Sequence, residues 1–370
     1  MVLQHVGGWN MGRKKSYYIF TPEKQKHKGP GCLILLLAVA FAIVVLSVLS
    51  NAAMNQKMDL VSEKVRVMSL DKKFENFTVL HISDLHGDER GLDADKWRTL
   101  LYGKGFSAVT LTGDMVGKGG DYTPLVSLIK TLKQIKADVP VYVIAGDDDP
   151  TPVISTLHGN PDVLADWVRA AQEAGAIYLD RPVSQAVGKV TVWFIPEYLY
   201  SVDIPGMQES LTRQKQDMEA VGQQYEGEGG ATYRALCYRL DAITASAAAI
   251  KAMTKDDLQI GVTHVPLQAD YVREMIDWAD EGAIFSFRRL TLVLAGHYCG
   301  GQWRLGSLGP IYVPEKGWFV GDSGVVGMQR INSISQYISG GIGASDFYPM
   351  PGRLFNTPNV SLLAFTAKIE

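Results

Sequence analysis

Five short apolar runs in this 370-residue chain are each followed by residues that bind metal ions. The runs are rich in β-branched residues and end at Gly or at a polar residue, which is typical of buried strands. They cover 78–82, 108–111, 141–145, 258–262 and 290–295. The residues that follow them are Asp84, His86, Asp114, Asp147, His264, His297 and Cys299. Because the ends of neighbouring strands meet at one edge of an α/β sheet, these side chains are predicted to form one site.

Helical segments are expected between the strands, at 93–102, 125–135 and 162–174. Alternation of strands and helices predicts βαβ packing and an α/β fold. The first strand of the domain is expected at 65–70. With 46% apolar residues, the chain can bury a large core in one domain or in one domain with a small insertion.

Residues 206–256 interrupt this alternation. Two helices are expected there, at 207–224 and 231–251, joined by a Gly-rich segment. One interpretation is a cap over the metal site that selects the substrate and contacts lipid. The other is an ordinary peripheral pair of helices, and the sequence leaves both open.

The N-terminal region predicts a membrane anchor. A basic leader at 1–30 precedes residues 32–49, an apolar run without a charged residue. At about 1.5 Å per residue, a helix of this length nearly crosses a bilayer core. We therefore expect a transmembrane anchor at 31–52, a linker at 53–64 and a catalytic domain at 65–370. A cleaved signal peptide is the alternative.

The distribution of charge bears on location and on partners. The leader has six Lys or Arg residues and one Glu, which predicts that the N-terminus is cytoplasmic and that the catalytic domain lies outside the cell membrane. The rest of the chain has 30 basic and 38 acidic residues. A moderately acidic domain argues against a general nucleic-acid binder, so no nucleic-acid partner is expected.

The motifs around the seven residues resemble the calcineurin-like metallophosphoesterase family. The family pattern is Asp-x-His, Gly-Asp, Gly-Asn-His-Asp/Glu, a later His and Gly-His-x-His, and the match runs from about residue 77 to the C-terminus, more weakly at 200–257. The segments 296–305, 309–314, 337–345 and 353–366 are similar to a membrane-associated branch that includes UDP-2,3-diacylglucosamine pyrophosphatase-type enzymes. The resemblance implies a four-layer αββα sandwich, with the segment 206–256 as a helical insertion.

The resemblance also implies two divalent metal ions joined by a bridging carboxylate, Asp114. The first metal would be held by Asp84, His86 and Cys299, and the second by Asp147, His264 and His297. Such a pair makes a water molecule acidic and clamps the phosphate oxygens, which is the chemistry of phosphoester or pyrophosphate hydrolysis. Carboxylate and imidazole ligands suit Mn, Fe or Zn. The implied substrate is a phosphorylated small molecule or a lipid-linked phosphate.

Cys299 departs from the family pattern, because it replaces the second His of Gly-His-x-His. A thiolate is a softer ligand and favours Zn or Fe over Mg. A disulfide with Cys237 and a packed thiol are the other possibilities.

Asp148 replaces the family histidine that is thought to protonate the leaving group. An aspartate with an ordinary pKa of about 3.9 is no general acid at neutral pH unless burial or a neighbouring carboxylate raises that pKa. Asp148 is therefore a candidate catalytic acid, unless the leaving group needs no proton. His158 could take that role, although a histidine in a loop usually has none, and His81 is expected to pack in the core. A catalytically degenerate metal-binding sensor or scaffold at the membrane is the alternative to an enzyme.

Overall fold

The computed structural model describes residues 31–67, 70–154, 163–222, 227–282, 285, 289–332 and 334–367. The chain divides into two units, Met1–Leu49 and Ser50–Glu370. His158, a candidate proton donor, lies outside the described residues.

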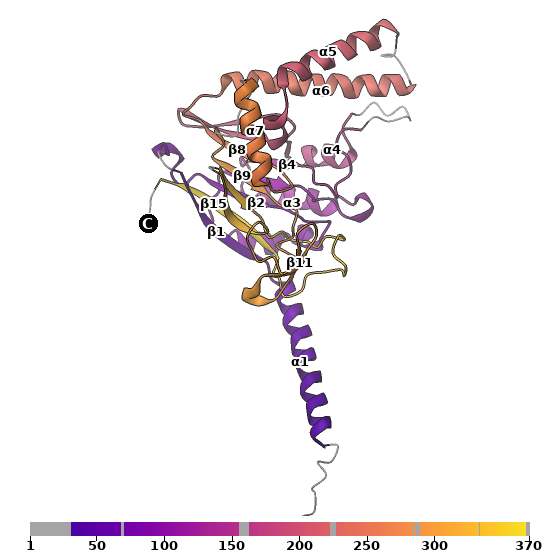
Figure 1. The fold of residues 1–370 in the computed structure, drawn as a ribbon, viewed down its shortest axis with the longest axis vertical. Helices are drawn as coiled ribbons and strands as arrows, with labels where there is room; N and C mark the ends of the chain where they lie inside the picture. The colour runs from indigo at the N-terminus through magenta and orange to yellow at the C-terminus, as the bar shows by residue number, and fades with distance from the viewer. Residues whose placement is uncertain are drawn as a thin grey trace, which may run out of the picture. The chain divides into compact units, whose positions relative to one another are not determined.

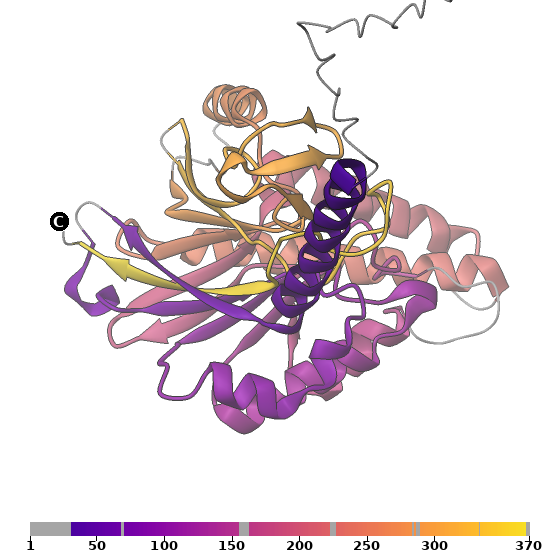
Figure 2. The same cartoon turned by 90° about the horizontal axis from the view of Figure 1, so that it is seen from below.

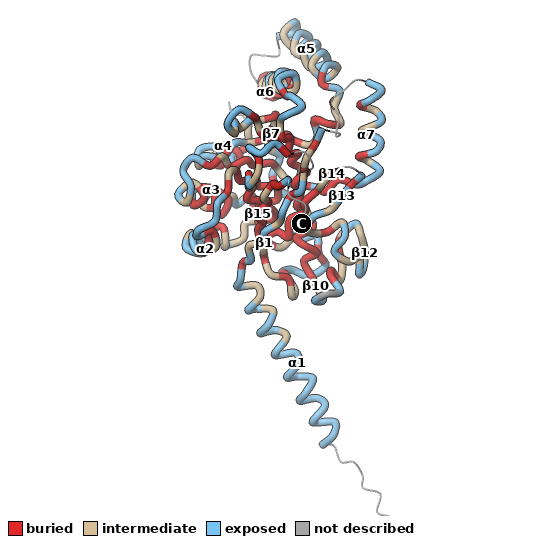
Figure 3. The backbone as a smooth tube through the Cα atoms, turned by 90° about the vertical axis from the view of Figure 1, so that its left-hand side faces the viewer, coloured by how far each residue is buried: buried red, intermediate tan, exposed pale blue. Residues whose placement is uncertain are grey.

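Helix α1 (Gly31–Gln56) contains no buried residue. Its apolar side chains are exposed along most of its length, as the pale colour of α1 in Figure 3 shows. By length and composition this helix is able to cross a membrane. At about 1.5 Å per residue, a helix of 26 residues is longer than a bilayer core is thick.

The first sheet of the second unit carries the first three strand-end motifs (Figure 1). Its strands β2, β3 and β4 are parallel, so their carboxyl ends lie at one edge. Helices α2, α3 and α4 cover one face through a shared apolar core. In spatial order the strands are β1 (Asp59–Arg66), β15 (Asn359–Thr366), β2 (Thr78–Ile82), β3 (Ala108–Thr112), β4 (Val141–Ile144) and β5 (Ile177–Tyr178). The helices are α2 (Ala94–Leu100), α3 (Thr123–Ile135) and α4 (Asp166–Glu173).

The second sheet carries the remaining motifs, after the parallel strands β8 and β9. Side chains of helices α5, α6 and α7 contribute to the apolar cluster on one of its faces. Its order is β13 (Gly327–Ile331), β14 (Ile334–Ile338), β9 (Leu292–Ala295), β8 (Leu258–Val262), β7 (Val190–Pro196) and β6 (Val183–Val187). The helices are α5 (Ile204–Ala220), α6 (Gly227–Ala252) and α7 (Ala269–Gly282).

The two sheets pack face to face (Figure 2). Tyr142 of β4 and Phe194 of β7 stack with their ring centroids 4.2 Å apart between them. Along β2, Val79 faces the neighbouring sheet and Leu80 faces the helices, as the alternation of a strand requires. The expected helix–sheet–sheet–helix architecture is confirmed, and in Figure 3 its strands form the buried interior.

Smaller elements complete the description. A three-stranded sheet contains β10 (Trp303–Arg304), β11 (Pro310–Val313) and β12 (Gly317–Trp318). Short 3₁₀ helices occupy Lys72–Phe74, Glu89–Leu92, Lys118–Gly120, Glu197–Ser201 and Gly306–Leu308.

Several expected boundaries need correction. The strand expected at 65–70 begins at Asp59 and ends at Arg66, because all of its residues pair in parallel with β15. Residues 53–64, expected as a linker, hold the end of α1 and most of β1. Strand β6 and helix α7 were not expected. The helices expected at 207–224 and 231–251 are present as α5 and α6.

Arg353 ties together the C-terminal loops beside the strand ends. Its buried guanidinium group donates to the carbonyl oxygens of Asn356 at 3.0 Å, Gly343 at 2.8 Å and Gly340 at 2.9 Å. Its own carbonyl oxygen accepts from the side-chain amides of Asn51 at 3.2 Å and Asn55 at 2.9 Å. One residue therefore fixes three loop carbonyls and contacts the last turns of α1.

We expect Arg353→Met to lower the free energy of unfolding by about 3 kcal/mol, because three buried carbonyls lose a charged donor. The thermal midpoint of the detergent-solubilised chain should fall by on the order of 5 °C. Arg213→Met is the control, since the exposed ion pair of Arg213 with Glu209 contributes less than about 1 kcal/mol. Equal midpoints for the two variants would contradict this role of Arg353.

Candidate metal centre

The seven predicted residues lie in loops that leave five strands. Two follow β2, one follows β3, one follows β4, one follows β8 and two follow β9. In order they are Asp84, His86, Asp114, Asp147, His264, His297 and Cys299. Hydrogen bonds connect the loops, since the backbone N–H of Asp84 donates to Gly113 O at 3.1 Å and that of His86 to Asp114 O at 2.8 Å.

Five of the seven residues have a backbone conformation that is uncommon outside glycine. Their φ angles are positive: Asp84 51°, His86 47°, Asp114 53°, His297 78° and Cys299 47°. Such angles cost free energy, persist only where the surrounding structure imposes them, and cluster at functional sites. The loops are thus held in shapes that aim their side chains inward.

Asp84, His86 and Cys299 form the first group. One candidate ligand atom from each lies within 4.8 Å of the others, and Cys299 Sγ is 3.6 Å from His86 Nε2. Asp84 is fully buried, and it accepts from the His297 backbone N–H at 2.8 Å and from the Ser83 hydroxyl. Burial raises the pKa of Asp84, and it also raises the pKa of the Cys299 thiol well above its usual value. A nearby cation is what allows such a thiol to ionise.

The disulfide considered for Cys299 is not formed in the structure, where both Cys237 and Cys299 are free thiols.

Asp147, His264 and His297 form the second group, again with candidate ligand atoms within 4.8 Å of one another. Asp147 Oδ1 is 2.7 Å from His264 Nε2 and 3.3 Å from His297 Nδ1. Burial acts to raise the pKa of Asp147, but the two histidine rings outweigh it and hold that pKa well below its usual range. The Asp147 carboxylate, which follows a strand of the first sheet, thus contacts two histidines that follow strands of the second sheet.

His264 provides the clearest test of whether a cation fits. Its Nδ1 lies 2.8 Å from Thr112 O, which only accepts hydrogen bonds, so Nδ1 carries the proton. Nε2 is buried and has no hydrogen-bond partner among the described residues, although carboxylate oxygens of Asp147 and Asp114 lie 2.7 and 3.1 Å away. Two anionic oxygens facing a nitrogen lone pair require a positive charge between or upon them. The donor set therefore fits a divalent metal.

Asp114 lies between the two groups. Its Oδ2 is 3.1 Å from His264 Nε2 and 3.7 Å from His86 Nε2, and its Oδ1 accepts from the Asp148 N–H at 2.9 Å. Only 2% of the residue is exposed. A Cβ at Gly146 would lie 2.1 Å from Asp114 Oδ1, so this approach requires glycine. Asp114 thus has the position that a carboxylate bridging two cations would need.

Asp148 is partly exposed, and its Oδ2 is 3.6 Å from His86 Nδ1. Burial and the nearby Asp114 carboxylate raise the pKa of Asp148. A raised pKa is what a carboxyl group needs to act as a proton donor near neutral pH.

Asp149 is a residue whose role the sequence did not reveal. Its carboxylate accepts from the backbone N–H of Val116 at 2.7 Å and of Gly146 at 2.8 Å, and burial raises its pKa to about 6. It therefore joins the loops that follow β3 and β4. The sequence Asp147-Asp148-Asp149 predicts a cluster of carboxylates, but it does not indicate which of the three side chains is buried.

Other residues considered from the sequence have structural roles. His81 is buried, its Nε2 is 2.8 Å from Thr112 Oγ1, and burial lowers its pKa to about 3, so the expected packing role is confirmed. Arg304 donates to Gly300 O at 2.7 Å and pairs with Asp322. Gly341 has a φ of 69°, and a Cβ there would lie 2.9 Å from the Cβ of Asp84, so the turn beside Asp84 requires glycine.

Comparison with known proteins identifies the family. The model of the calcineurin-like phosphoesterase family matches residues 77–300, and the chain belongs to that family. A search of curated proteins found no match. The membrane-associated branch named above thus remains a prediction.

Two solved structures have a weaker likeness to this chain. Phosphopantetheinyl hydrolase of Mycobacterium tuberculosis has 11% identity and a TM-score of 0.35, covering 73% of this chain and 91% of that one. The protein TT1561 of Thermus thermophilus has 12% identity and a TM-score of 0.36, covering 72% of this chain and 90% of that one. These values bear on neither substrate nor mechanism.

We expect a Co²⁺-loaded chain to show near-ultraviolet thiolate-to-cobalt absorption, because Cys299 Sγ lies within the first group of ligand atoms. Cys299→Ser should remove this absorption, whereas Cys237→Ser should keep it. Absorption that persists in Cys299→Ser would show that Cys299 is no ligand.

Proposed function

We propose that this protein hydrolyses a phosphoester or pyrophosphate bond with two divalent cations, on an envelope or lipid-linked substrate. The observation that carries the proposal is the convergence of acidic side chains on His264, since Asp84 and Asp114 form one group of candidate ligand atoms with it and Asp147 belongs to a second group that also contains it. Membership of the calcineurin-like phosphoesterase family supports the reaction class.

Each group has a definable role. Asp84, His86 and Cys299 would hold one cation, Asp147, His264 and His297 the other, and Asp114 would contact both. When bound, two such cations supply an acidic water and neutralise charge on the phosphoryl oxygens. Around them, the His297 N–H and the Ser83 hydroxyl hold Asp84, and Thr112 O orients the ring of His264. These contacts preserve the ligand geometry as charge develops on the substrate.

Asp148 is proposed as the proton donor to the leaving group. It lies beside His86 and Asp114, it is reachable from solvent, and its pKa is raised. An acid of this kind contributes about 10²–10⁴ in rate when the leaving group needs a proton.

We place the enzyme at the cell membrane through α1, with its catalytic domain outside. The length and composition of α1 support the anchor, and the basic leader supports the orientation. Attachment next to a bilayer favours a substrate that is itself part of the envelope.

For the reaction, we expect the purified chain to hydrolyse bis-p-nitrophenyl phosphate with Mn²⁺ or Zn²⁺ and to lose activity in a chelator. His297→Ala and Asp114→Ala should abolish turnover, because each removes a ligand, whereas Asp148→Ala should reduce it by about 10²-fold or more. Asp270→Ala, an exposed position on α7, is the control. Full activity of His297→Ala refutes the ligand assignment.

The rival function is a metal-binding sensor or scaffold without turnover, favoured by the replacement of the family histidine by Asp148. The same assay separates the two, because a sensor binds metal stoichiometrically yet hydrolyses nothing with any metal.

For the topology, a protease added outside intact cells should degrade the catalytic domain, since the basic leader is retained in the cytoplasm. Immunoblotting with an antibody against the domain is the measurement. If the domain survives in intact cells and is degraded only after lysis, the outward orientation is wrong.

A further inference from the structure

Two cavities meet the candidate metal centre, one at each group of ligands. The larger, of about 820 Å³, is lined by Asp147 and His264 of the second group. The smaller, of about 440 Å³, is lined by His86 of the first group and by Asp148. A substrate whose phosphorus lies at the metals can therefore extend into both.

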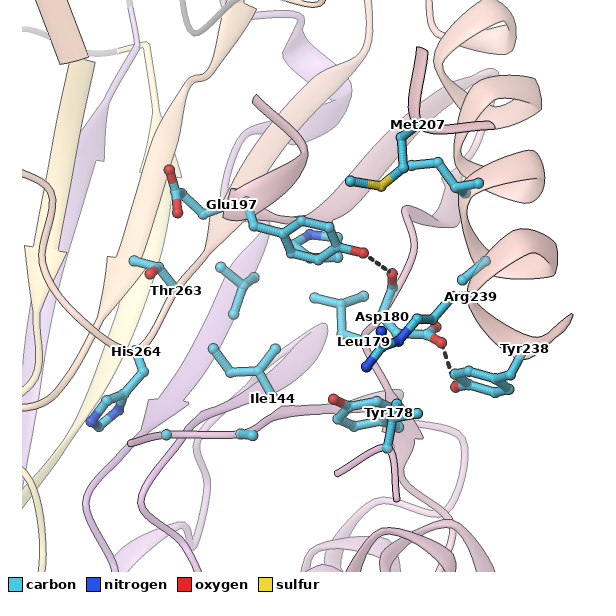
Figure 4. A pocket seen from close by; sticks show the side chains of 18 of the residues that line it. Ile144, Tyr178, Leu179, Asp180, Glu197, Met207, Tyr238, Arg239, Thr263 and His264 are labelled. Atoms are coloured by element: carbon cyan, nitrogen blue, oxygen red, sulfur yellow. Dashed lines mark hydrogen bonds between the residues drawn. The ribbon is translucent and has the colours of Figure 1, made fainter. Parts of the chain in front are cut away.

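The larger cavity, here called the insertion cavity, lies between the inserted helices α5 and α6, which form part of its wall, and the strand ends and loops of the main domain. Met207, Ser210, Leu211 and Gln214 recur at the spacing of one face of α5, and that face lines the cavity. Figure 4 shows His264 on one side of the cavity and Arg239 of α6 on the other, with Ile144 and Leu179 between them.

Most polar groups in this wall already have partners in the protein. The Tyr198 hydroxyl donates to Asp180 O at 2.7 Å. The Tyr238 hydroxyl donates to the Asp180 carboxylate (Figure 4), and Arg181 forms an ion pair with the same carboxylate. Glu197 accepts from the Tyr271 hydroxyl at 3.0 Å. With these groups paired, the surface left for a ligand is mainly hydrocarbon. Arg239 is different, because the described chain gives it no partner, and it can meet a polar atom of the same ligand.

The smaller cavity has the opposite character. Its wall includes the glycine-rich turn Lys118–Gly120 and Asp346. Lys118 Nζ pairs with Asp346 Oδ2 at 2.9 Å, and 89% of the Lys118 side chain is exposed. Backbone groups and an exposed ion pair suit a hydrated, polar ligand group rather than a hydrocarbon.

We propose that the substrate is a phosphodiester or pyrophosphate with two unlike arms, an apolar arm in the insertion cavity and a polar arm beside Lys118–Gly120. This inference rests on the proposed function and specifies its substrate class. A phosphomonoester has a single arm and would use only one of the two cavities. Hydrolysis cleaves one P–O bond, with water giving a hydroxyl group to phosphorus and a proton to the departing oxygen.

The test compares methyl and hexyl p-nitrophenyl phosphate with the full chain in nanodiscs. Each buried methylene can strengthen binding by up to about fourfold, so kcat/KM should be at least about tenfold higher for the hexyl ester. The monoester p-nitrophenyl phosphate should be a poorer substrate than either diester. A monoester that is hydrolysed as fast as the hexyl diester would overturn the two-arm proposal.

Variants locate the apolar arm. Leu211→Trp fills the insertion cavity and should bring the hexyl-to-methyl ratio of kcat/KM close to one. Ser210→Phe, at an exposed position on the same face, should act likewise if Leu211→Trp does not fold. Val221→Trp, at a residue that is 70% exposed at the end of α5, should keep the wild-type ratio. An unchanged ratio in both cavity variants would overturn the placement.

Lys118→Trp tests the polar arm. A bulky side chain at the smaller cavity should lower kcat/KM for both diesters about equally, and by a larger factor than for the monoester. Equal losses for the diesters and the monoester would contradict a separate site for that arm.

Binding separates this proposal from the proposed function. Calorimetry with hexylphosphonate and methylphosphonate should show tighter binding of the hexyl compound, lost in Leu211→Trp. Turnover of the diesters without any chain-length preference would overturn the cavity proposal and leave the hydrolase standing. Chain-length-dependent binding with no turnover would leave the cavity and remove the hydrolase.

Discussion

The concentration of carboxylates around His264 is the interaction on which the rest of the site depends. Asp114 and Asp147 face its Nε2 at 3.1 and 2.7 Å, and the fully buried Asp84 lies in the same cluster. Several carboxylates in so small a volume repel each other unless positive charge is present. They raise the pKa of His264 well above its usual value even though burial lowers it. The cluster therefore favours a cation, whether a proton or a metal ion.

The fold makes this arrangement possible by bringing together two sheets. Strands β2, β3 and β4 contribute the carboxylates and His86, whereas β8 and β9 contribute the other histidines and Cys299. Positive φ angles at five of the ligand positions and the close approach of Gly146 to Asp114 cost free energy. Packing between the sheets, the backbone hydrogen bonds that Asp149 accepts and those that Arg353 donates offset that cost.

Much of this could be predicted from sequence, because buried strands and the residues after them leave local patterns. The strands at 78–82 and 258–262 and the convergence of their polar ends follow from those patterns. The first strand was predicted at 65–70 instead of Asp59–Arg66, because its bounds are set by pairing with β15, which lies about 300 residues further along the chain. The structural role of Asp149 and the insertion cavity depend on contacts between elements far apart in the chain. No local pattern contains that information.

The most direct test of the account is a crystal structure of the metal-loaded chain with anomalous scattering measured at the metal edge. We expect two anomalous peaks, both in contact with Asp114. One should also be bound by Asp84 and Cys299, and the other by Asp147 and His264. A single peak, or peaks that Asp114 does not touch, would contradict the binuclear centre.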